Sequence, residues 1–102
     1  MAIGKAGVHI RFALAMNCVY ILKSEKNGRY YIGSTNNLDR RLAEHKFGKT
    51  KSLKHLRPLT LVFMKEYENL GVARMVERKL KKLKNRNIIE QVIEDKDIRM
   101  GL

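Results

Sequence analysis

Hydrophobic and polar positions alternate with the period of a β-strand in three stretches of this chain and with the period of a helix in three others. The first two strand-like stretches, residues 19–22 and 29–32, flank Asn27-Gly28. This dipeptide readily adopts the two positive φ angles of a two-residue hairpin turn. Residues 33–36 are glycine and polar residues and are expected to end the second strand. The pattern therefore predicts a β-hairpin over residues 19–32.

A third strand is predicted over residues 59–67. Its apolar side chains fall on both sides of the strand, since Leu59 and Phe63 alternate with Val62 and Met64. A strand that is apolar on both faces is typical of the middle of a sheet. We therefore predict that this strand is the central one.

A helix is predicted over residues 38–46, with Asn36 or Asn37 as its N-cap. Leu38 and Leu42 fall on one side of it and form the inward stripe. Two polar side chains lie along one edge of that stripe, where they leave the core and reach a cleft: Arg41 and His45.

A second helix is predicted over residues 70–84, capped by Asn69, and a short third one over residues 87–93. Glu77 stands at the margin between the apolar and basic faces of the second helix. The expected buried stripe consists of Val72, Met75, Val76, Leu80 and Leu83. The expected basic outer face consists of Arg74, Arg78, Lys81 and Lys82.

The two ends of the chain differ from the middle. Residues 1–16 are weakly apolar and have no clean period, so they are expected to be peripheral. Two interpretations of them stay open: a short signal-like segment, or a start codon set too early, with Met16 as the true initiator. The residues from Glu94 onward are polar and are expected to fray. We therefore place one domain at residues 17–95, followed by a tail at residues 96–102.

Composition narrows the class of protein. The 102 residues suffice for one modest core and not for two. No apolar run approaches the length of a membrane span. The lone Cys18 excludes an internal disulfide framework and fits a reducing cytosol, so we expect a cytoplasmic protein. Twenty-two Lys and Arg against ten Asp and Glu leave a net charge of +12, which favours a polyanionic partner, chiefly nucleic acid.

Five of these cations are concentrated in the segment after the first predicted helix, which contains one glycine and two hydroxyl side chains and ends at Pro58. The alternative interpretation of this segment is a solvated connector, but the density of charge favours contact with phosphates. The residues expected to bind nucleic acid are Lys46, Lys49, Lys51, Lys54 and Arg57.

Several of these polar residues follow one another along the chain in a characteristic order and at characteristic spacings. Tyr20 precedes Tyr31-Ile32-Gly33, Arg41 follows eight residues after that glycine, His45 comes four residues later, and Glu77 lies on the second long helix. In this order and on these elements they resemble the GIY-YIG nuclease family. The likeness covers about residues 17–94 and is closest to small free-standing bacterial members. It extends to the nuclease domains of homing endonucleases and of the excision-repair incision subunit. Cys18 and Val19 depart from the pattern at two positions that serve the backbone and packing.

The resemblance implies a compact α/β (α+β) domain with a three-stranded antiparallel sheet flanked by helices. It also implies hydrolysis of a phosphodiester with one divalent metal ion, Mg²⁺ or Mn²⁺. Tyr31 matches the general base or water-positioning tyrosine, with Tyr20 beside it on the partner strand. Arg41 matches the arginine that binds the scissile phosphate, His45 a residue that assists proton transfer, and Glu77 the single carboxylate ligand of the metal.

The chemistry is consistent with these roles, because phosphodiester cleavage needs an activated water, a neutralised phosphoryl group and a stabilised leaving oxygen. Each residue alone also has a structural interpretation. Tyr20, Tyr30 and Tyr31 are ordinary strand residues, and Tyr30 is left structural. Glu77 alone would pair with a basic residue of its own helix, such as Lys81.

The sequence therefore predicts a metal-dependent endonuclease that acts on DNA and does not associate with a membrane. Two alternatives stay open. One is a basic DNA- or RNA-binding module in which the catalytic set is idle. The other is a nuclease subunit that needs a protein partner in a repair or recombination complex. The oligomeric state is not predicted.

Overall fold

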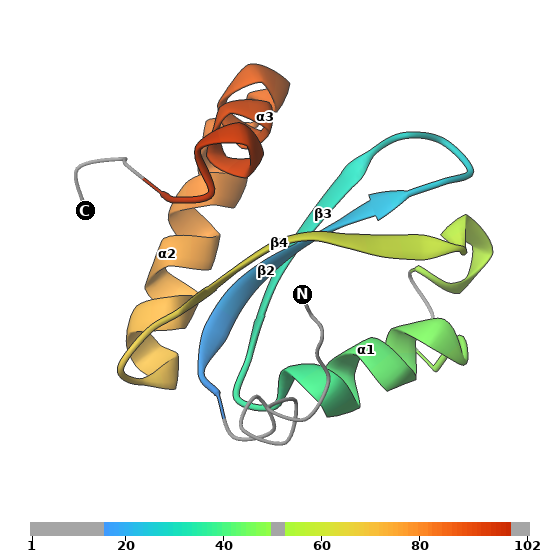
Figure 1. Ribbon diagram of the computed structural model, residues 1–102, viewed down its shortest axis with the longest axis horizontal. Coiled ribbons are helices and arrows are strands. Elements are labelled where there is room, and N and C mark those ends of the chain that lie inside the picture. The colour runs from blue at the N-terminus through green and yellow to red at the C-terminus, as the bar shows by residue number, and fades with distance from the viewer. Residues whose placement is uncertain (1–15, 50–52, 99–102) are drawn as a thin grey trace.

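The computed structural model describes residues 16–49 and 53–98 (Figure 1). The predictions made for residues 1–15, for Lys51 and for residues 99–102 lie outside this described part. No helix in it has both the length and the apolar composition needed to cross a membrane.

Within the described residues, one antiparallel sheet of three strands separates a helix on one face from two helices on the other (Figure 1). The α+β class and the three-stranded sheet predicted from the sequence are confirmed. The strands are β2 (Cys18–Ser24), β3 (Tyr30–Thr35) and β4 (Leu59–Glu66), and the helices are α1 (Leu38–Lys46), α2 (Leu70–Leu83) and α3 (Arg86–Asp95).

The central strand is β2, and the prediction that residues 59–67 form it is wrong. The strand order is β3-β2-β4, so β4 lies at an edge. Ile21 pairs with Phe63 while the next residue, Leu22, pairs with Leu61, which leaves Val62 as an extra residue in a β-bulge. After the bulge, side chains of β4 point to the opposite face from the one that simple alternation predicts. This shift made the sequence look apolar on both faces of the strand.

The hairpin between β2 and β3 is longer than the predicted two-residue turn. Four residues separate Ser24 from Arg29, and the Ser24 backbone N–H donates to the Arg29 carbonyl over 2.9 Å. The Ser24 hydroxyl oxygen accepts from the backbone N–H groups of Lys26 and Asn27, which holds the chain in a local turn. Only Gly28 then needs a positive φ, of 74°, to return the chain to the sheet.

Residues 33–36 do not end the return strand, because β3 continues to Thr35. Gly33 pairs with Tyr20 of β2, and the Tyr20 ring lies in the space that a side chain at position 33 would fill. The glycine therefore serves the packing of the sheet and does not interrupt it.

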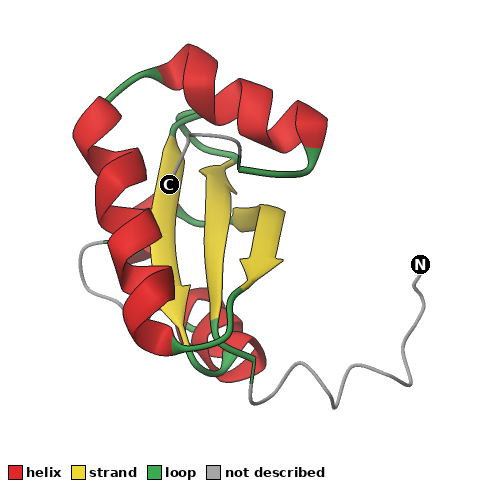
Figure 2. Cartoon of the chain, turned by 90° about the vertical axis from the view of Figure 1, so that its left-hand side faces the viewer, coloured by secondary structure: helices red, strands yellow, loops and turns green. Residues whose placement is uncertain are grey.

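The sheet has a hydrophobic cluster on each face. Figure 2 shows the long α2 alongside the strands with α3 across their end. On the α1 face the buried residues are Cys18, Tyr20, Leu22 and Leu38. On the face of α2 and α3 they include Val19, Ile21, Phe63, Ala73, Val76, Leu80, Ile89, Val92 and Ile98.

The predicted buried stripe of α2 is right for Val76 and Leu80 and wrong at two positions, Met75 and Leu83. Their exposed fractions are 41% and 45%. Ala73 takes the inward position, and Met75 lies about 200° around the helix from it. Leu83 is the last helical residue. The predicted basic residues of the outer face are exposed.

The last helix begins at Arg86, after its N-cap Asn85, and not at residue 87 as predicted. It continues to Asp95, where Lys96 adopts a left-handed φ of 58° and ends it. The chain then turns back and buries Ile98 in the larger cluster, so the prediction of fraying from Glu94 onward is wrong as far as this residue.

Candidate active site

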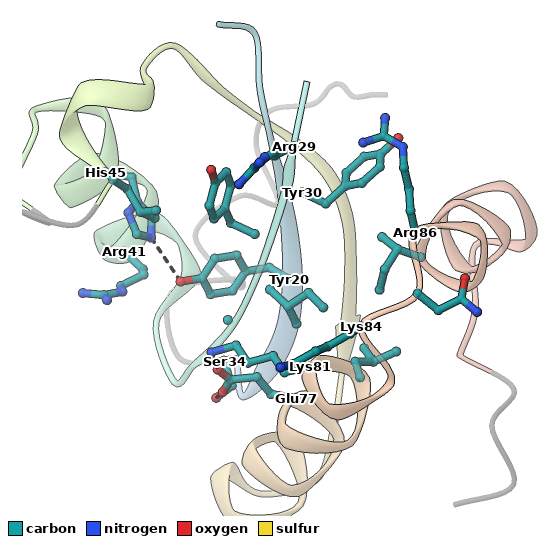
Figure 3. A pocket seen from close by; sticks show the side chains of 17 residues that line it. Tyr20, Arg29, Tyr30, Ser34, Arg41, His45, Glu77, Lys81, Lys84 and Arg86 are labelled. Atoms are coloured by element: carbon teal, nitrogen blue, oxygen red, sulfur yellow. Dashed lines mark hydrogen bonds and ion pairs between the residues drawn. The ribbon is translucent and has the colours of Figure 1, made fainter. Parts of the chain in front are cut away.

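A cleft of about 740 Å³ follows the outer edge of β3 (Figure 3). Among the described residues β3 pairs only with β2. Five consecutive residues of β3, Tyr30 to Ser34, line the cleft, and their side chains alternate between the two faces of the sheet. The cleft therefore spans both sides of the strand and receives side chains from α1 and from α2.

The structure brings all five residues predicted for catalysis and metal binding to this one cleft. They come from four elements: Tyr20 from β2, Tyr31 from β3, Arg41 and His45 from α1, and Glu77 from α2. In Figure 3, Arg41 and His45 lie on one side of Tyr20, with Glu77 below it.

Tyr20 occupies the centre of the cleft because Gly33 has no side chain. A methyl group at position 33 would lie 2.5 Å from both Cζ and the hydroxyl oxygen of Tyr20, closer than any van der Waals contact. The ring therefore reaches across β3, and its hydroxyl forms a hydrogen bond of 3.1 Å with Nε2 of His45 (Figure 3). Both side chains are 4% exposed.

Burial decides the charge of this pair. Desolvation raises the pKa of Tyr20, and the neighbouring Arg41 guanidinium opposes that rise. Desolvation, followed by the charge of Arg41, lowers the pKa of His45. At neutral pH Tyr20 is therefore protonated and His45 is uncharged. If Nδ1 carries the imidazole proton, Nε2 accepts from Tyr20; the other tautomer reverses the bond.

Arg41 is held by a carboxylate of its own helix, Glu44. Its Nη1 donates to Oε1 of Glu44 over 2.9 Å, one helical turn away. The neighbouring Tyr20 hydroxyl and the ion pair with Glu44 raise the pKa of Arg41, and the same ion pair lowers the pKa of Glu44. Contacts within the protein thus position the guanidinium beside the Tyr20 hydroxyl.

Both carboxylate oxygens of Glu77 have partners. The Ser34 hydroxyl donates to Oε1 over 2.5 Å, and Nζ of Lys81 lies 2.6 Å from Oε2. The ion pair with Lys81 is the purely structural role that the sequence analysis considered for Glu77. Ser34 was missed because it was expected to break the strand. Extending the period-two alternation of β3 by two residues would have placed its side chain on the α2 face, beside Glu77.

The donors around Glu77 are oxygen atoms, which are the ligands of hard divalent cations. The described residues contain no group of three or more His, Cys, Asp and Glu side chains placed to hold a metal. Magnesium retains several of its waters, so one carboxylate can hold it, and the Ser34 hydroxyl adds an oxygen next to that carboxylate. The Lys81 ammonium already occupies this position as a cation, on a side chain that is 54% exposed.

The predicted nucleic-acid-binding loop lies elsewhere. Its described cations, Lys46, Lys49, Lys54 and Arg57, are exposed, but none of them lines the cleft. The Arg57 guanidinium donates to the backbone carbonyls of Lys46 and Lys54, over 3.1 and 2.8 Å, and so ties the end of α1 to a following 3₁₀ turn. Phosphate binding by this loop stays a prediction.

A different set of cations lines the cleft. Arg29, Lys81, Lys84 and Arg86 come from the hairpin, the end of α2 and the start of α3. No sequence pattern joins these residues, since only the packing of α2 and α3 beside β3 brings them together. Asn85, which lies between Lys84 and Arg86 and also lines the cleft, uses its side-chain oxygen to cap α3.

The match of this chain to a known catalytic domain gives it a nuclease-type fold. Residues 16–90 match the GIY-YIG catalytic domain, and the chain belongs to the GIY-YIG family, as the motif predicted.

Its curated relatives include proteins named UPF0213. One from Clostridium perfringens is 40% identical over 85 residues, which cover 82% of this chain and 89% of that protein. One from Listeria welshimeri is 36% identical over 74% of this chain and 83% of its own length. One from Photorhabdus laumondii is 41% identical over 64% of this chain and 62% of its own length. No solved structure gives a significant match.

Proposed function

We propose that this protein is a divalent-metal-dependent endonuclease that hydrolyses phosphodiester bonds in DNA. The observation that carries the proposal is the convergence of the Tyr20–His45 pair, Arg41 and Glu77 in one cleft beside Tyr31. The net charge of +12 provides the attraction for a polyanionic substrate. In this proposal the substrate phosphate lies over Tyr20, between α1 and α2.

The Tyr20–His45 pair supplies the proton transfer. As an attacking water is deprotonated, its proton passes to a tyrosine hydroxyl oxygen, and the tyrosine proton passes to Nε2 of His45. A neutral imidazole is required for this step, and the lowered pKa of His45 keeps it neutral. Tyr31 points to the same face as Tyr20 and orients the water from the β3 side.

Arg41 neutralises charge on the phosphoryl group directly, whereas Glu77 would do so through a cation that it holds. The planar guanidinium of Arg41 is suited to two phosphate oxygens, and its contact with Glu44 fixes its direction. Glu77 and the neighbouring Ser34 hydroxyl would hold Mg²⁺ or Mn²⁺, which when bound stabilises negative charge on the phosphoryl oxygens and acidifies a water. Lys81 would leave Oε2 of Glu77 when the metal binds.

One observation favours the alternative of a non-catalytic nucleic-acid-binding module. Both oxygens of Glu77 are engaged by Ser34 and Lys81, an arrangement that is complete without a metal. A binding module would use the same basic cleft without cutting the substrate. The two functions differ in whether Glu77 is needed for cleavage.

The test is a cleavage assay on labelled single-stranded, duplex and flapped DNA with magnesium, manganese or a chelator. Glu77→Gln keeps the shape of the side chain and an acceptor for Ser34, so it should fold like the parent protein. We expect it to lose at least ~10²-fold in cleavage rate, as when one preorganised charge is removed from a site. Glu68→Gln, an exposed carboxylate that does not line the cleft, is the charge-matched control and should cut normally.

Equal cleavage by the two variants would remove Glu77 from the mechanism. Salt-sensitive binding without cleavage of any substrate by the parent protein would favour the binding module. Metal-dependent cleavage that Glu77→Gln abolishes and Glu68→Gln retains is the outcome expected of the endonuclease.

A further inference from the structure

The cleft extends beyond the proposed catalytic residues to the junction of α2 and α3. Its walls there are formed by Arg29, Tyr30, Lys84 and Arg86, which Figure 3 shows on the side of Tyr20 away from His45. Among the residues that line the cleft, five are Lys or Arg and one is a carboxylate, Glu77, which already pairs with Lys81. This end of the cleft therefore carries an uncompensated positive charge.

The Arg86 guanidinium at this end is fixed in place. Its Cζ lies 4.7 Å from the centre of the Tyr30 ring. Its Nη1 donates to the Gly28 carbonyl over 3.2 Å, and its Nε donates to Oε2 of Glu90 over 3.2 Å. The Tyr30 hydroxyl donates to the same carboxylate oxygen over 3.2 Å. Arg86 and Tyr30 thus form a rigid planar surface, and the Arg86 side chain is still 54% exposed.

Lys84 and Arg29 are different in kind. Lys84 ends α2 in a left-handed conformation with φ of 46°, and its backbone N–H donates to the Lys81 carbonyl. Arg29 leaves the hairpin just before β3. Both side chains are exposed and line the cleft, and no ion pair holds either of them among the described residues. Their charges are available to a ligand.

The size of the cleft limits what it can receive. A volume of about 740 Å³ lies in the range of small-ligand pockets and accommodates a short length of one strand. Unpaired bases stack on aromatic rings and on arginine planes, whereas paired bases are already stacked within the helix. The guanidinium plane of Arg86, next to the two cations Arg29 and Lys84 that form no ion pair among the described residues, suits the binding of a single strand.

We propose that the α3 end of the cleft is a subsite for an unpaired nucleic acid strand. Lys84 and Arg29 each bind one of the phosphates that neighbour the scissile one, and the Arg86 guanidinium, supported by Tyr30, stacks on the adjacent base. The inference deepens the proposed function and rests on it, because it specifies that the substrate strand is unpaired on the α3 side of the cut.

The test measures binding, not cleavage, with the Glu77→Gln protein and fluorescent oligonucleotides of one sequence as single-stranded DNA, single-stranded RNA and duplex DNA. Arg29→Gln with Lys84→Gln should weaken binding of single strands about tenfold or more. The pair should also reduce the slope of log K against log salt by about 1.4, the value for two phosphate contacts on a single strand. Arg78→Gln with Lys82→Gln removes the same charge from the exposed face of α2, outside the cleft. This control pair should change the single-strand affinity and the salt slope much less than the cleft pair does.

Arg86→Lys separates stacking from charge. It keeps the positive charge and removes the planar surface, so single-strand affinity should fall while the salt slope stays unchanged. Thermal unfolding of each variant confirms that it is folded at the temperature of the assay. The ratio of DNA to RNA binding identifies the type of strand that the subsite prefers.

Two results would overturn the inference. The first is equal binding by the cleft pair and the control pair. The second is a loss of duplex affinity as large as the loss for single strands. Because no step of the test requires cutting, failure of the proposed nuclease function is distinguished from failure of the subsite.

Discussion

Replacing Gly33 by alanine should displace the Tyr20 ring and separate its hydroxyl from His45. The new methyl group would lie 2.5 Å from Cζ and the hydroxyl oxygen of Tyr20 and 3.0 Å from Cε2. Carbon atoms in van der Waals contact are ~3.5–4.0 Å apart, so the ring must move by about 1 Å. The hydrogen bond of 3.1 Å to Nε2 of His45 does not survive a shift of that size in the direction away from β3.

The expected loss of stability combines three contributions. Overpacking of a buried site costs ~1–3 kcal/mol, and loss of a buried hydrogen bond costs ~0.5–1.5 kcal/mol. Alanine restricts the unfolded chain more than glycine does, which offsets about 0.4–1 kcal/mol. The free energy of unfolding should therefore fall by about 2 kcal/mol for Gly33→Ala. For a chain of this size that corresponds to a decrease in Tm on the order of 10 °C.

A double-mutant cycle with Tyr20→Leu isolates the clash, because leucine lacks all three of the crowded ring atoms. In that background Gly33→Ala should cost nothing or stabilise slightly, which gives a coupling energy of about 2 kcal/mol between the two sites. Gly28→Ala is the control. Its φ is 74° and nothing lies within 4 Å of the added methyl group, so its backbone strain of ~1–2 kcal/mol should be the same in both backgrounds.

The assay is urea unfolding of the four proteins of the cycle and of the two control variants, followed by circular dichroism. An equal cost of Gly33→Ala in the presence and absence of the Tyr20 ring would refute this account of the glycine. A loss of stability smaller than that of Gly28→Ala would refute it as well.

Three further predictions concern pH, capping and thiol reactivity. Because burial lowers the pKa of His45, the unfolded chain binds a proton at a pH where the folded chain does not. The contribution of His45 to the free energy of unfolding should therefore be complete above about pH 6.5 and decline below it. His45→Gln should flatten this decline in urea titrations at different pH. Asn69 accepts from the Val72 backbone N–H over 2.8 Å, so Asn69→Ala should lower the free energy of unfolding by ~1 kcal/mol and Asn69→Asp should restore it. Burial and the charge of Glu66 raise the pKa of Cys18 to about 11. A disulfide reagent at pH 8 should therefore label the thiol only as fast as the protein unfolds. Rapid labelling of the folded protein would contradict the burial of Cys18.

Local signals in the sequence predicted the helices well. The bounds of α1 are those expected from its periodicity, and the Asn69 side chain caps α2 as predicted. The order of the strands was not predictable in the same way, because pairing joins residues far apart in the chain. The bulge at Val62 shows why: an unpaired residue shifts the alternation by one position, and an edge strand then has the sequence of a central strand.

The candidate site was predictable as far as its motif extends. The five residues of the motif do line one cleft, although the role of each remains a proposal. The residues that hold them were only partly predictable: the alternation of β3 indicates the face of Ser34, but its contact with Glu77 joins positions 43 apart in sequence. The Arg86–Tyr30 contact likewise depends on how α3 folds back beside β3. Such contacts depend on tertiary packing, which no local period records.

The location of the cleft at an edge strand explains why a glycine belongs in the motif. The sheet separates its two faces, with Arg41 and His45 on the α1 side and Glu77 on the α2 side. Side chains from both faces can meet only where the sheet ends. Tyr20 starts from the central strand and reaches that edge by crossing Gly33, where it forms a hydrogen bond with His45 and where the charge of Glu77 contributes to raising its pKa. A side chain at position 33 would leave the α1 side and the α2 side of the site folded but would separate them. Its effect on activity should therefore exceed its effect on the stability of the fold.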